Sequence, residues 1–315
     1  MILIISIRGD LHSLAVQHGV RRRGYEQCHI VECDNMGGSP TLLWKSWTNP
    51  SESKILTSEN ITISLEDVSV IWWRRVRADQ LTATYLTNDH ERDIVNNDCR
   101  GALAGILAAT FSGEWISRPE ATDRAADKLF QLSIAQRAGF RIPRTMVSQS
   151  RGDVAEFFRQ EKKVIVKPVV GARGPLLYTQ FINDPLSIPE QSFVACPAVY
   201  QEYIEGRRHI RMNCFGDDVN AALIETVDLD WRPNLNVPVS KWTVPDTLAQ
   251  QVRSVLQQLG LRMGIVDIKL TPDGEPVWLE VNPQGQFLFL EPLLGEPLTE
   301  RFVDFLLLCL RERDR

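Results

Sequence analysis

Asp267, Glu280 and Asn282 have the side-chain types and the spacing of a magnesium site. They lie in two strand-like runs, 263–270 and 277–282, which are separated by a turn with Asp-Gly at its centre. Asp-Gly between alternating runs is a strong hairpin signal. A turn symmetric about this dipeptide places Asp267 opposite Glu280, and Asn282 follows on the same face because strand side chains repeat every two residues. Oxygen ligands of this type suit Mg²⁺ held between carboxylates and the phosphates of a substrate.

The same acidic pair has a purely structural explanation, which the hairpin alone does not exclude. Like charges placed opposite one another destabilise a sheet, and Lys269 is one cation that could offset them. A solvated acidic face is therefore the alternative to a metal site, and a one-residue slip in the turn would end the facing geometry. The opposite face of the hairpin is expected to be core and carries Val266, Ile268, Leu270, Val277, Leu279 and Val281.

Bulk composition restricts the classes to which the protein can belong. A chain of 315 residues, 43% hydrophobic and 24% charged, is long enough for two or three packed subdomains of ordinary globular composition. The net charge of −5 disfavours a general nucleic-acid binder. Six cysteines without CxxC spacing are typical of reduced cytosolic thiols. The apolar runs are too short to cross a membrane, and residues 1–7 are typical of a first strand rather than a signal peptide. We therefore expect a cytoplasmic protein with no membrane and no nucleic-acid partner.

The N-terminal third has the pattern of a parallel sheet covered by helices. A strand over 2–7, a helix and a strand over 28–33 form a β-α-β start. No GxGxxG motif follows the first strand, so a dinucleotide site is not supported. Further on, the strand-like run 68–75 ends in two tryptophans followed by Arg74 and Arg75. Arginine suits bidentate carboxylate binding, although surface arginines covering a buried tryptophan explain the same residues.

Two lysines and a glycine-containing loop are placed where they could contact phosphate. Lys128 lies within a helix expected over 122–138. Lys167 is near the end of the β-branched strand 164–168, where an ammonium group can act as a point charge toward phosphate. The loop 170–175 follows, and its two glycines allow close approach of the backbone to an anion. Each of these features is also common in ordinary surface segments.

Taken in order, these segments resemble the ATP-grasp carboxylate–amine ligases. The run LEVNPQGQ at 279–286 resembles the closing metal-binding segment of that family, and FLFLE at 287–291 resembles more narrowly the graspetide synthetases, which are microviridin-type peptide macrocycle synthetases. The resemblance implies an α/β ATP-grasp fold, in which the nucleotide is held between two lobes and an N-terminal parallel-sheet pre-ATP-grasp domain precedes them. The expected boundaries are 1–117 for the N-terminal substrate-binding domain, 118–200 for the central lobe and 201–315 for the C-terminal lobe with the metal site.

The resemblance also implies a role for each matching residue. The Mg²⁺ ligands would be Asp267, Glu280 and Asn282, and Arg211 would neutralise charge on the transferring phosphoryl group. ATP would be bound by Lys128, Lys167, Glu202, Tyr203 and Ile204, with Gly171, Arg173 and Gly174 in the lid over the phosphates and Arg74, Arg75, Trp231 and Arg232 at the substrate.

His209 departs from the pattern of the family. A hairpin expected near 209–226 places His209, Arg211 and Asn213 on one face, but relatives often carry an acidic residue two positions before the arginine. Arg211 is therefore the residue that can be carried over, and the role of His209 is left open. A partly buried, hydrogen-bonded histidine is favoured over a catalytic one.

The reaction implied by the resemblance is ATP-dependent peptide macrocyclisation. Mg-ATP would activate Asp or Glu side chains of a ribosomal precursor peptide, made of a leader and an acidic core, as acyl phosphates. Ser, Thr or Lys side chains would then form ester or amide cross-links, releasing ADP and phosphate. One alternative is an ATP-grasp ligase that conjugates glutamate or another amino acid to a protein or small molecule. Another is a non-catalytic nucleotide- or peptide-binding module, which the retained metal ligands disfavour. A homodimer is left open.

Overall fold

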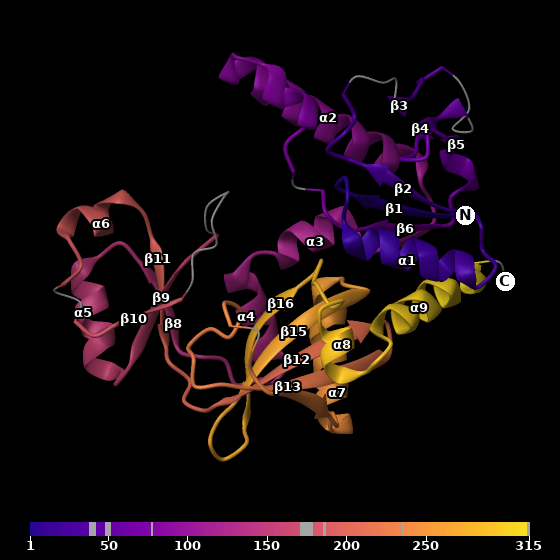
Figure 1. Ribbon diagram of the computed structural model, residues 1–315. Helices are drawn as coiled ribbons and strands as arrows, with labels where there is room; N and C mark the ends of the chain where they lie inside the picture. Colours follow the sequence, from indigo (N-terminus) through magenta and orange to yellow (C-terminus); the bar gives the residue numbers. More distant parts are fainter. Residues whose placement is uncertain are drawn as a thin grey trace.

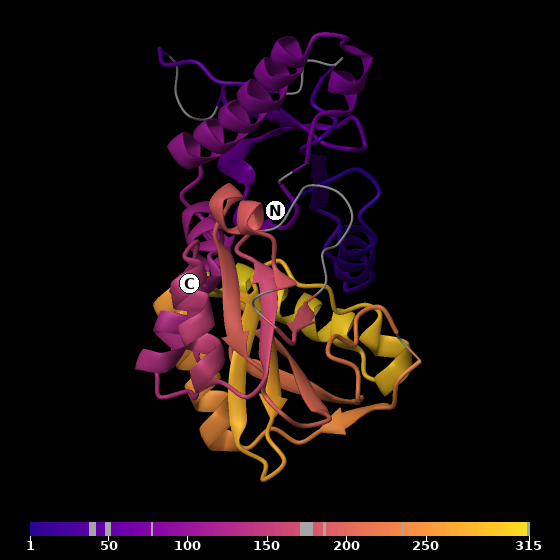
Figure 2. The same ribbon diagram turned by 90° about the vertical axis from the view of Figure 1, so that its left-hand side faces the viewer.

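The computed structural model describes residues 1–37, 42–47, 52–76, 78–170, 179–184, 187–234 and 236–313. In Figure 1 an N-terminal α/β domain stands beside a small lobe that contains β8–β11 and a larger lobe that contains β12–β16. After a turn of 90°, the small lobe faces the viewer and the N-terminal domain stands above both lobes (Figure 2). Among the described residues, no helix combines the length and apolar character needed to cross a bilayer.

The N-terminal domain is built on a parallel sheet of order β2-β1-β6-β7. All five side chains of β1 are buried, as expected for a strand covered on both faces. The elements of the sheet and its helices are β1 (Ile2–Ser6), α1 (Leu11–Arg22), β2 (Cys28–Glu32), β6 (Val70–Trp73), α2 (Asp89–Thr110) and β7 (Glu114–Ile116). A small antiparallel sheet and two short 3-10 helices complete the domain, namely β3 (Leu42–Leu43), β4 (Lys54–Leu56), β5 (Thr62–Ser64), η2 (Leu65–Asp67) and η3 (Leu81–Tyr85).

The small lobe is an antiparallel sheet of order β10-β9-β11-β8 with two helices packed on it. Its core is small and includes Val154 and Phe157 of α5 together with Phe193 of α6. The elements are β8 (Thr145–Ser148), α5 (Arg151–Gln160), β9 (Val164–Pro168), β10 (Gln180–Ile182), α6 (Glu190–Ala195) and β11 (Ala198–Glu202).

The large lobe is an antiparallel sheet of order β14-β13-β12-β15-β16. Helices α4 and α7 cover one face of this sheet, and their apolar residues share one core cluster with its strands. The elements of this lobe are α3 (Pro119–Ala125), α4 (Lys128–Arg137), β12 (Arg208–Phe215), β13 (Asp218–Glu225), β14 (Val239–Trp242), α7 (Asp246–Leu259), β15 (Met263–Leu270), β16 (Pro276–Asn282), α8 (Leu290–Leu294) and α9 (Leu298–Arg313).

Two segments pack against a different part of the protein from the one that their position in the sequence suggested. The single helix expected over 122–138 is divided into α3 and α4, because the Asp127 side chain caps α4 by accepting hydrogen bonds from the N–H groups of Leu129 and Phe130. Both helices belong to the core of the large lobe, although the expected boundary placed them in the central lobe. Similarly, the C-terminal α9 lies beside α1 and shares a core cluster with it (Figure 1). Burial of apolar side chains therefore links the two ends of the chain.

The register of the β15–β16 hairpin brings the two predicted metal carboxylates face to face. Asp267 pairs with Glu280, as expected. Nearer the turn, Ile268 pairs with Trp278, so the register is displaced by one residue and a bulge at Leu279 restores it. The bulge also changes which side chains are core: Trp278 is fully buried there, whereas Leu279, expected on the core face, lines a cavity. The predicted facing pair is confirmed, but it depends on the bulge and not on a symmetric turn.

Candidate active site

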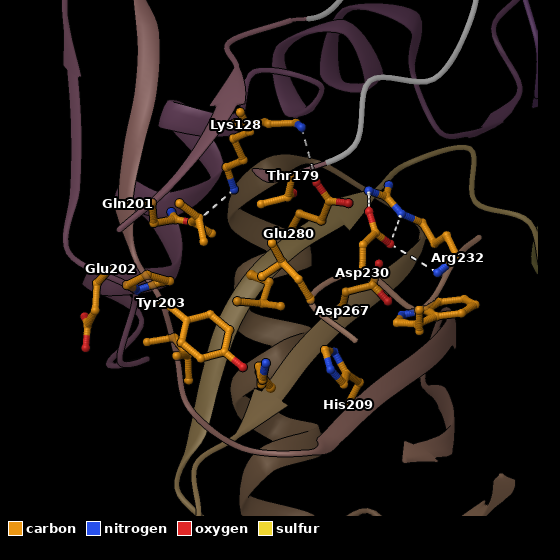
Figure 3. A pocket seen from close by; sticks show the side chains of 18 of the residues that line it. Lys128, Thr179, Gln201, Glu202, Tyr203, His209, Asp230, Arg232, Asp267 and Glu280 are labelled. Carbon is orange, nitrogen blue, oxygen red and sulfur yellow. Dashed lines mark hydrogen bonds and ion pairs between the residues drawn. The ribbon is translucent and has the colours of Figure 1, made fainter. Parts of the chain in front are cut away.

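A cavity of about 260 Å³ lies between the small and large lobes (Figure 3). Nine of the sequence-predicted site residues line it, and they come from α4, β9, β11 and its exit, the segment after β13, and the β15–β16 hairpin. These nine are Lys128, Lys167, Glu202, Tyr203, Ile204, Trp231, Arg232, Asp267 and Glu280. Arg211 does not line the cavity but contacts Asp267, while Arg74, Arg75 and Asn282 lie outside it.

The end of the cavity formed by Asp267 and Glu280, which is the proposed metal end, has both carboxylates paired with cations. Both oxygens of Asp267 accept a hydrogen bond from Nη1 of Arg211, each at 2.9 Å. Glu280 lies 3.6 Å from Nζ of Lys128. Lys269, the cation considered from the sequence, makes no ion pair with either carboxylate and instead contacts the ring of Tyr203. Arg211 and Lys128 therefore offset the repulsion between Asp267 and Glu280.

The donor set at this end fits a magnesium ion. Burial raises the pKa of Asp267; Arg211 opposes this shift and the facing Glu280 adds to it. A divalent cation between two such carboxylates relieves that repulsion, and carboxylate and amide oxygens are the ligands that Mg²⁺ prefers. Within the described ranges, no three His, Cys, Asp or Glu side chains form a metal cluster. The third protein ligand would be Asn282, which lies two residues beyond Glu280 and whose Oδ1 accepts the N–H of Gln284 at 3.0 Å.

Lys167 lies at the opposite side of the cavity, on strand β9 of the small lobe. Its ammonium group donates to Oε1 of Gln201 at 3.0 Å and has no carboxylate partner among the described residues. Burial lowers the pKa of Lys167 to about 8; Glu280 opposes this shift, while Lys128 and Arg232 reinforce it. A desolvated ammonium group with a neutral partner is suited to receive an anion.

We expect the affinity for Mg-ADP to fall as pH rises above about 8. Above its pKa, Lys167 must take up a proton to pair with phosphate, so the affinity loss approaches tenfold per pH unit. Calorimetry in buffers of different ionisation enthalpy measures both the affinity and the proton uptake. In Lys167→Met the affinity should be lower and this part of the pH dependence should be absent; an unchanged pH profile in that variant would contradict the assignment.

In the segment that joins the two lobes, one backbone N–H group at the cavity has no hydrogen-bond partner among the described residues. The N–H of Tyr203 donates to the carbonyl of Lys163 at 3.0 Å, whereas the N–H of Ile204 makes no hydrogen bond within the described chain. Glu202 contributes to the cavity wall, but its carboxylate points away from the centre (Figure 3) and accepts from Arg141 and from the N–H of Arg144. The Glu202 side chain therefore holds the joining segment against Arg141 and Arg144, and the N–H of Ile204 is a free donor at the cavity wall.

Two aromatic rings hold Arg211 in position: Trp231 in the segment after β13 and Phe289 in the segment after β16. Its guanidinium carbon lies 5.6 Å from the Trp231 ring and 5.7 Å from the Phe289 ring, and these two rings are stacked on each other. Nη2 of Arg211 also donates to the carbonyl of Gln286 at 3.2 Å. Arg232 is paired through two hydrogen bonds with Asp230 and lines the cavity near Glu280. Trp231 therefore positions Arg211, and Arg232 supplies a further cation at the cavity.

Arg74 links the N-terminal domain to the loop that follows the β15–β16 hairpin. It is 0% exposed and donates to Oδ2 of Asp10 at 3.1 Å and to the carbonyls of Gln284 and Gly285 at 2.7 and 2.9 Å. Its guanidinium group is thus closed off from a substrate, contrary to one of the two options expected from the sequence. Arg75, with 44% of its side chain exposed, remains available for that role.

His12 adds a second contact of the same kind. Its Nε2 accepts the N–H groups of Phe287 and Leu288 at 3.0 and 3.2 Å, so α1 is bound directly to the loop after Asn282. Burial lowers the pKa of His12 to about 3, with Arg74 contributing, which keeps the imidazole neutral and able to accept. Asp10 and His12 were not among the sequence-predicted residues; their position just after the first parallel strand was the available signal, since ligand sites gather at that edge.

Gly285 allows this loop to pack closely against β15. A Cβ built at Gly285 would lie 2.0 Å from Cγ1 and 2.4 Å from Cβ of Ile265, so an alanine there must displace the loop. We expect Gly285→Ala to weaken Mg²⁺-dependent nucleotide binding about tenfold, because displacing the loop moves Asn282 and the carbonyls bound by Arg74. Titration of Mg²⁺ at fixed ADP measures the effect. Gly105→Ala, on the open surface of α2, is the control and should bind normally; equal binding by both variants would show that the loop does not position the ligand.

The predicted lid residues Gly171, Arg173 and Gly174 lie outside the described residues. They stay a prediction.

Comparison with curated proteins finds two distant ligases. No protein-family model matches the sequence. The α-aminoadipate–LysW ligase LysX of Sulfurisphaera tokodaii is 23% identical over 143 residues, which are 43% of this chain and 50% of that protein. The tetrahydromethanopterin:α-L-glutamate ligase of Methanocaldococcus jannaschii is 22% identical over 205 residues, or 60% of this chain and 70% of that protein. The chain therefore matches about half the length of the first relative.

Solved structures match over nearly the whole chain. The macrocyclase MdnC bound with precursor peptide MdnA, from Microcystis aeruginosa, has a TM-score of 0.84 and 23% identity and covers 97% of this chain and 98% of its own. The macrocyclase MdnB of the same organism has a TM-score of 0.79 and 25% identity over 97% of this chain and 98% of its own. The ATP-grasp ligase PsnB complexed with minimal precursor, Mg and ADP has a TM-score of 0.82 and 20% identity over 98% and 97%.

The chain has the ATP-grasp fold, and the expected fold class is confirmed. Within that fold, it is similar over 97% of its length to two structures named as macrocyclases, and it carries carboxylates and cations at the cavity between its lobes.

Proposed function

We propose that the protein is an ATP-dependent ligase that activates Asp or Glu side chains of a ribosomal precursor peptide and links them to Ser, Thr or Lys side chains of the same peptide. The observation that carries this proposal is the facing pair Asp267–Glu280 at the inter-lobe cavity, with Lys128 and Lys167 in the cavity wall and Arg211 bonded to Asp267. Similarity over 97% of the chain to two structures named as macrocyclases, MdnC and MdnB, supports the choice of substrate. So do the precursor peptides bound in MdnC and in the ATP-grasp ligase PsnB.

In this proposal the chain binds and orients two substrates at the metal end of the cavity. Lys128 and Lys167 neutralise the phosphates of ATP, and the N–H of Ile204 binds the edge of the base. Asp267, Glu280 and Asn282 would hold Mg²⁺, which would supply charge neutralisation for the phosphates. Arg211, which bonds Asp267, would stabilise charge on the transferring phosphoryl group.

The activated carboxylate must then be attacked in a site that excludes water. A peptide carboxylate oxygen attacks the γ-phosphorus, ADP leaves, and the resulting acyl phosphate is attacked by a hydroxyl or amino group that loses its proton. Phosphate leaves and an ester or amide bond remains. Arg75 and Arg232 are the cations we assign to the acidic peptide, because both have exposed side-chain surface near this end of the molecule.

The test is to incubate the protein with Mg-ATP and a set of short peptides that contain Asp or Glu together with Ser, Thr or Lys, following ADP and peptide mass together. Loss of one water mass per ADP supports macrocyclisation. A mass gain when free amino acids are added would instead identify a conjugating ligase, the candidate favoured by the similarity to LysX and the glutamate ligase. Nucleotide binding without any ADP formation, with several acidic peptides, would contradict both ligase functions.

A further inference from the structure

A glutamine side chain from α4 bonds the outer edge of β16. Gln131 is 3% exposed; its Oε1 accepts the N–H of Val281 at 2.8 Å, and its Nε2 donates to the carbonyl of Val281 at 2.8 Å. β16 is the last strand of the large-lobe sheet, so within the described structure no further strand bonds the groups on this side. The Gln131 amide therefore takes the place of a neighbouring strand at Val281.

These two hydrogen bonds fall on the peptide units that connect Val281 to the proposed metal ligands. The N–H of Val281 belongs to the peptide unit shared with Glu280, and its carbonyl belongs to the unit shared with Asn282. Because a peptide unit is planar, holding its N–H or its carbonyl restrains the whole unit. Gln131 thus restrains the backbone of β16 on both sides of Val281.

The same helix carries Lys128, the lysine proposed to contact phosphate. Lys128 precedes Gln131 by three residues, so the two side chains share one face of α4. Its ammonium group lies 3.6 Å from Glu280, as drawn in Figure 3, but both side chains are about one-third exposed (33% and 29%). An ion pair of this kind holds two groups only weakly. The buried Gln131 amide is therefore the stronger link between the start of α4 and β16.

A third hydrogen bond fixes Gln131 itself. Its Nε2 also donates to the carbonyl of Ala125, the last residue of α3, at 2.5 Å. Both amide atoms of the side chain are thus bonded, and Gln131 does not line the cavity. It can affect a ligand only through the residues that it holds.

We propose that Gln131 is a positioning residue for the metal site, an inference that rests on the proposed ATP-dependent function. Gln131 holds Glu280 and Asn282 at a fixed place relative to Lys128, so that a divalent cation and a phosphate group are bound side by side. Hydrogen bonds that orient metal ligands from outside the coordination sphere typically change metal affinity by about 10–100-fold.

The test titrates Mg²⁺ at fixed ADP, without peptide, in wild type and in Gln131→Met. Methionine keeps the length of the side chain and removes its three hydrogen bonds. The Mg²⁺ concentration needed for half-maximal ADP binding should rise about 10–100-fold in this variant. Binding of ADP without metal should change little, because Gln131 does not line the cavity. Calorimetry measures both quantities.

Gln251→Met is the matched control. Nε2 of Gln251 donates to the carbonyl of Ala138 at 3.1 Å, so this glutamine links α7 to the opposite end of α4 from Lys128. Its replacement should leave the Mg²⁺ requirement at the wild-type value. Amide hydrogen exchange of the nucleotide-free proteins gives a readout without ligand: exchange in β16 should be faster in Gln131→Met and normal in Gln251→Met.

A second variant, Gln131→Glu, serves if Gln131→Met does not fold. A carboxylate still accepts the N–H of Val281 but cannot donate to the carbonyls of Val281 and Ala125. The Mg²⁺ requirement should rise in this variant too. A thermal melt of each protein separates the two roles, because a residue that only stabilises the fold lowers the melting temperature and leaves the Mg²⁺ requirement of the folded protein unchanged.

Two outcomes would overturn the inference. A wild-type Mg²⁺ requirement in the folded Gln131 variants would show that these hydrogen bonds only stabilise the fold. An equal rise in Gln251→Met would show that the effect does not depend on the contact with β16. Both leave the proposed ligase function standing, whereas absence of any Mg²⁺-dependent ADP binding by wild type would overturn the inference and that function together.

Discussion

Replacing Glu280 with glutamine should lower the rate of peptide-dependent ADP formation roughly 10²–10³-fold. Glutamine keeps the shape of the side chain but removes the negative charge that faces Asp267 across the hairpin. The loss has two physical causes: a divalent cation is bound less tightly, and Lys128 loses the carboxylate that lies 3.6 Å from its ammonium group. Steady-state ADP release, together with Mg²⁺ titration of ADP binding, measures both effects.

Glu275→Gln is the matched control for this substitution. Glu275 lies at the turn end of the same hairpin, is paired with Arg141 and does not line the cavity. Its replacement should change the rate by less than about threefold, because an exposed ion pair contributes little. Wild-type turnover by Glu280→Gln would remove Glu280 from the metal site and with it the main support for the proposed function.

Replacing Asp10 with asparagine should destabilise the protein by about 3–5 kcal/mol. Asp10 is 3% exposed at its side chain and is the carboxylate partner of the fully buried Arg74, so the substitution leaves a buried cation without its counter-charge. Because Arg74 also holds the carbonyls of Gln284 and Gly285, we expect Mg²⁺-dependent ADP binding to weaken as well. Denaturant unfolding gives the free energy of unfolding, and calorimetry gives the binding change.

The pH dependence of unfolding provides an independent check on Asp10. Burial raises the pKa of this carboxyl, but the Arg74 charge and its hydrogen bond outweigh that effect, so the pKa is lowered from 3.8. A lowered folded-state pKa adds stability that is fully present above the unfolded value and is lost as pH falls through the folded value. Wild type should therefore lose stability below about pH 4, and Asp10→Asn should lack this part of the loss.

Asp304→Asn is the control for a surface pair of the same chemistry. Asp304 is 59% exposed at its side chain and bonds Arg23 across the α1–α9 contact. Its replacement should cost less than about 1 kcal/mol. A similarly small loss of stability in Asp10→Asn would mean that the Asp10–Arg74 link between the N-terminal domain and the loop after the β15–β16 hairpin contributes little to folding.

The strands that position the site residues could be predicted from short-range patterns in the sequence. Alternation and an Asp-Gly turn predicted the β15–β16 hairpin, and the β-branched run before Lys167 predicted β9. The pairing of Asp267 with Glu280 was predicted correctly although the register near the turn differs by one residue. The bulge at Leu279 compensates for that difference. A bulge has no reliable sequence signal when Trp278 and Leu279 are both apolar, so the sequence could not decide which of them enters the core.

The amino-acid sequence by itself determined the fold class and the set of candidate groups, since side-chain periodicity and motif order are properties of neighbouring residues. Tertiary structure decided their partners: Arg74 turned inward to Asp10, Glu202 turned away to Arg141, and Lys269 was placed beside His209 without a counter-charge. These outcomes depend on contacts between residues far apart in the chain, where burial and charge pairing set the geometry. No local pattern encodes which of several arginines will meet a given carboxylate.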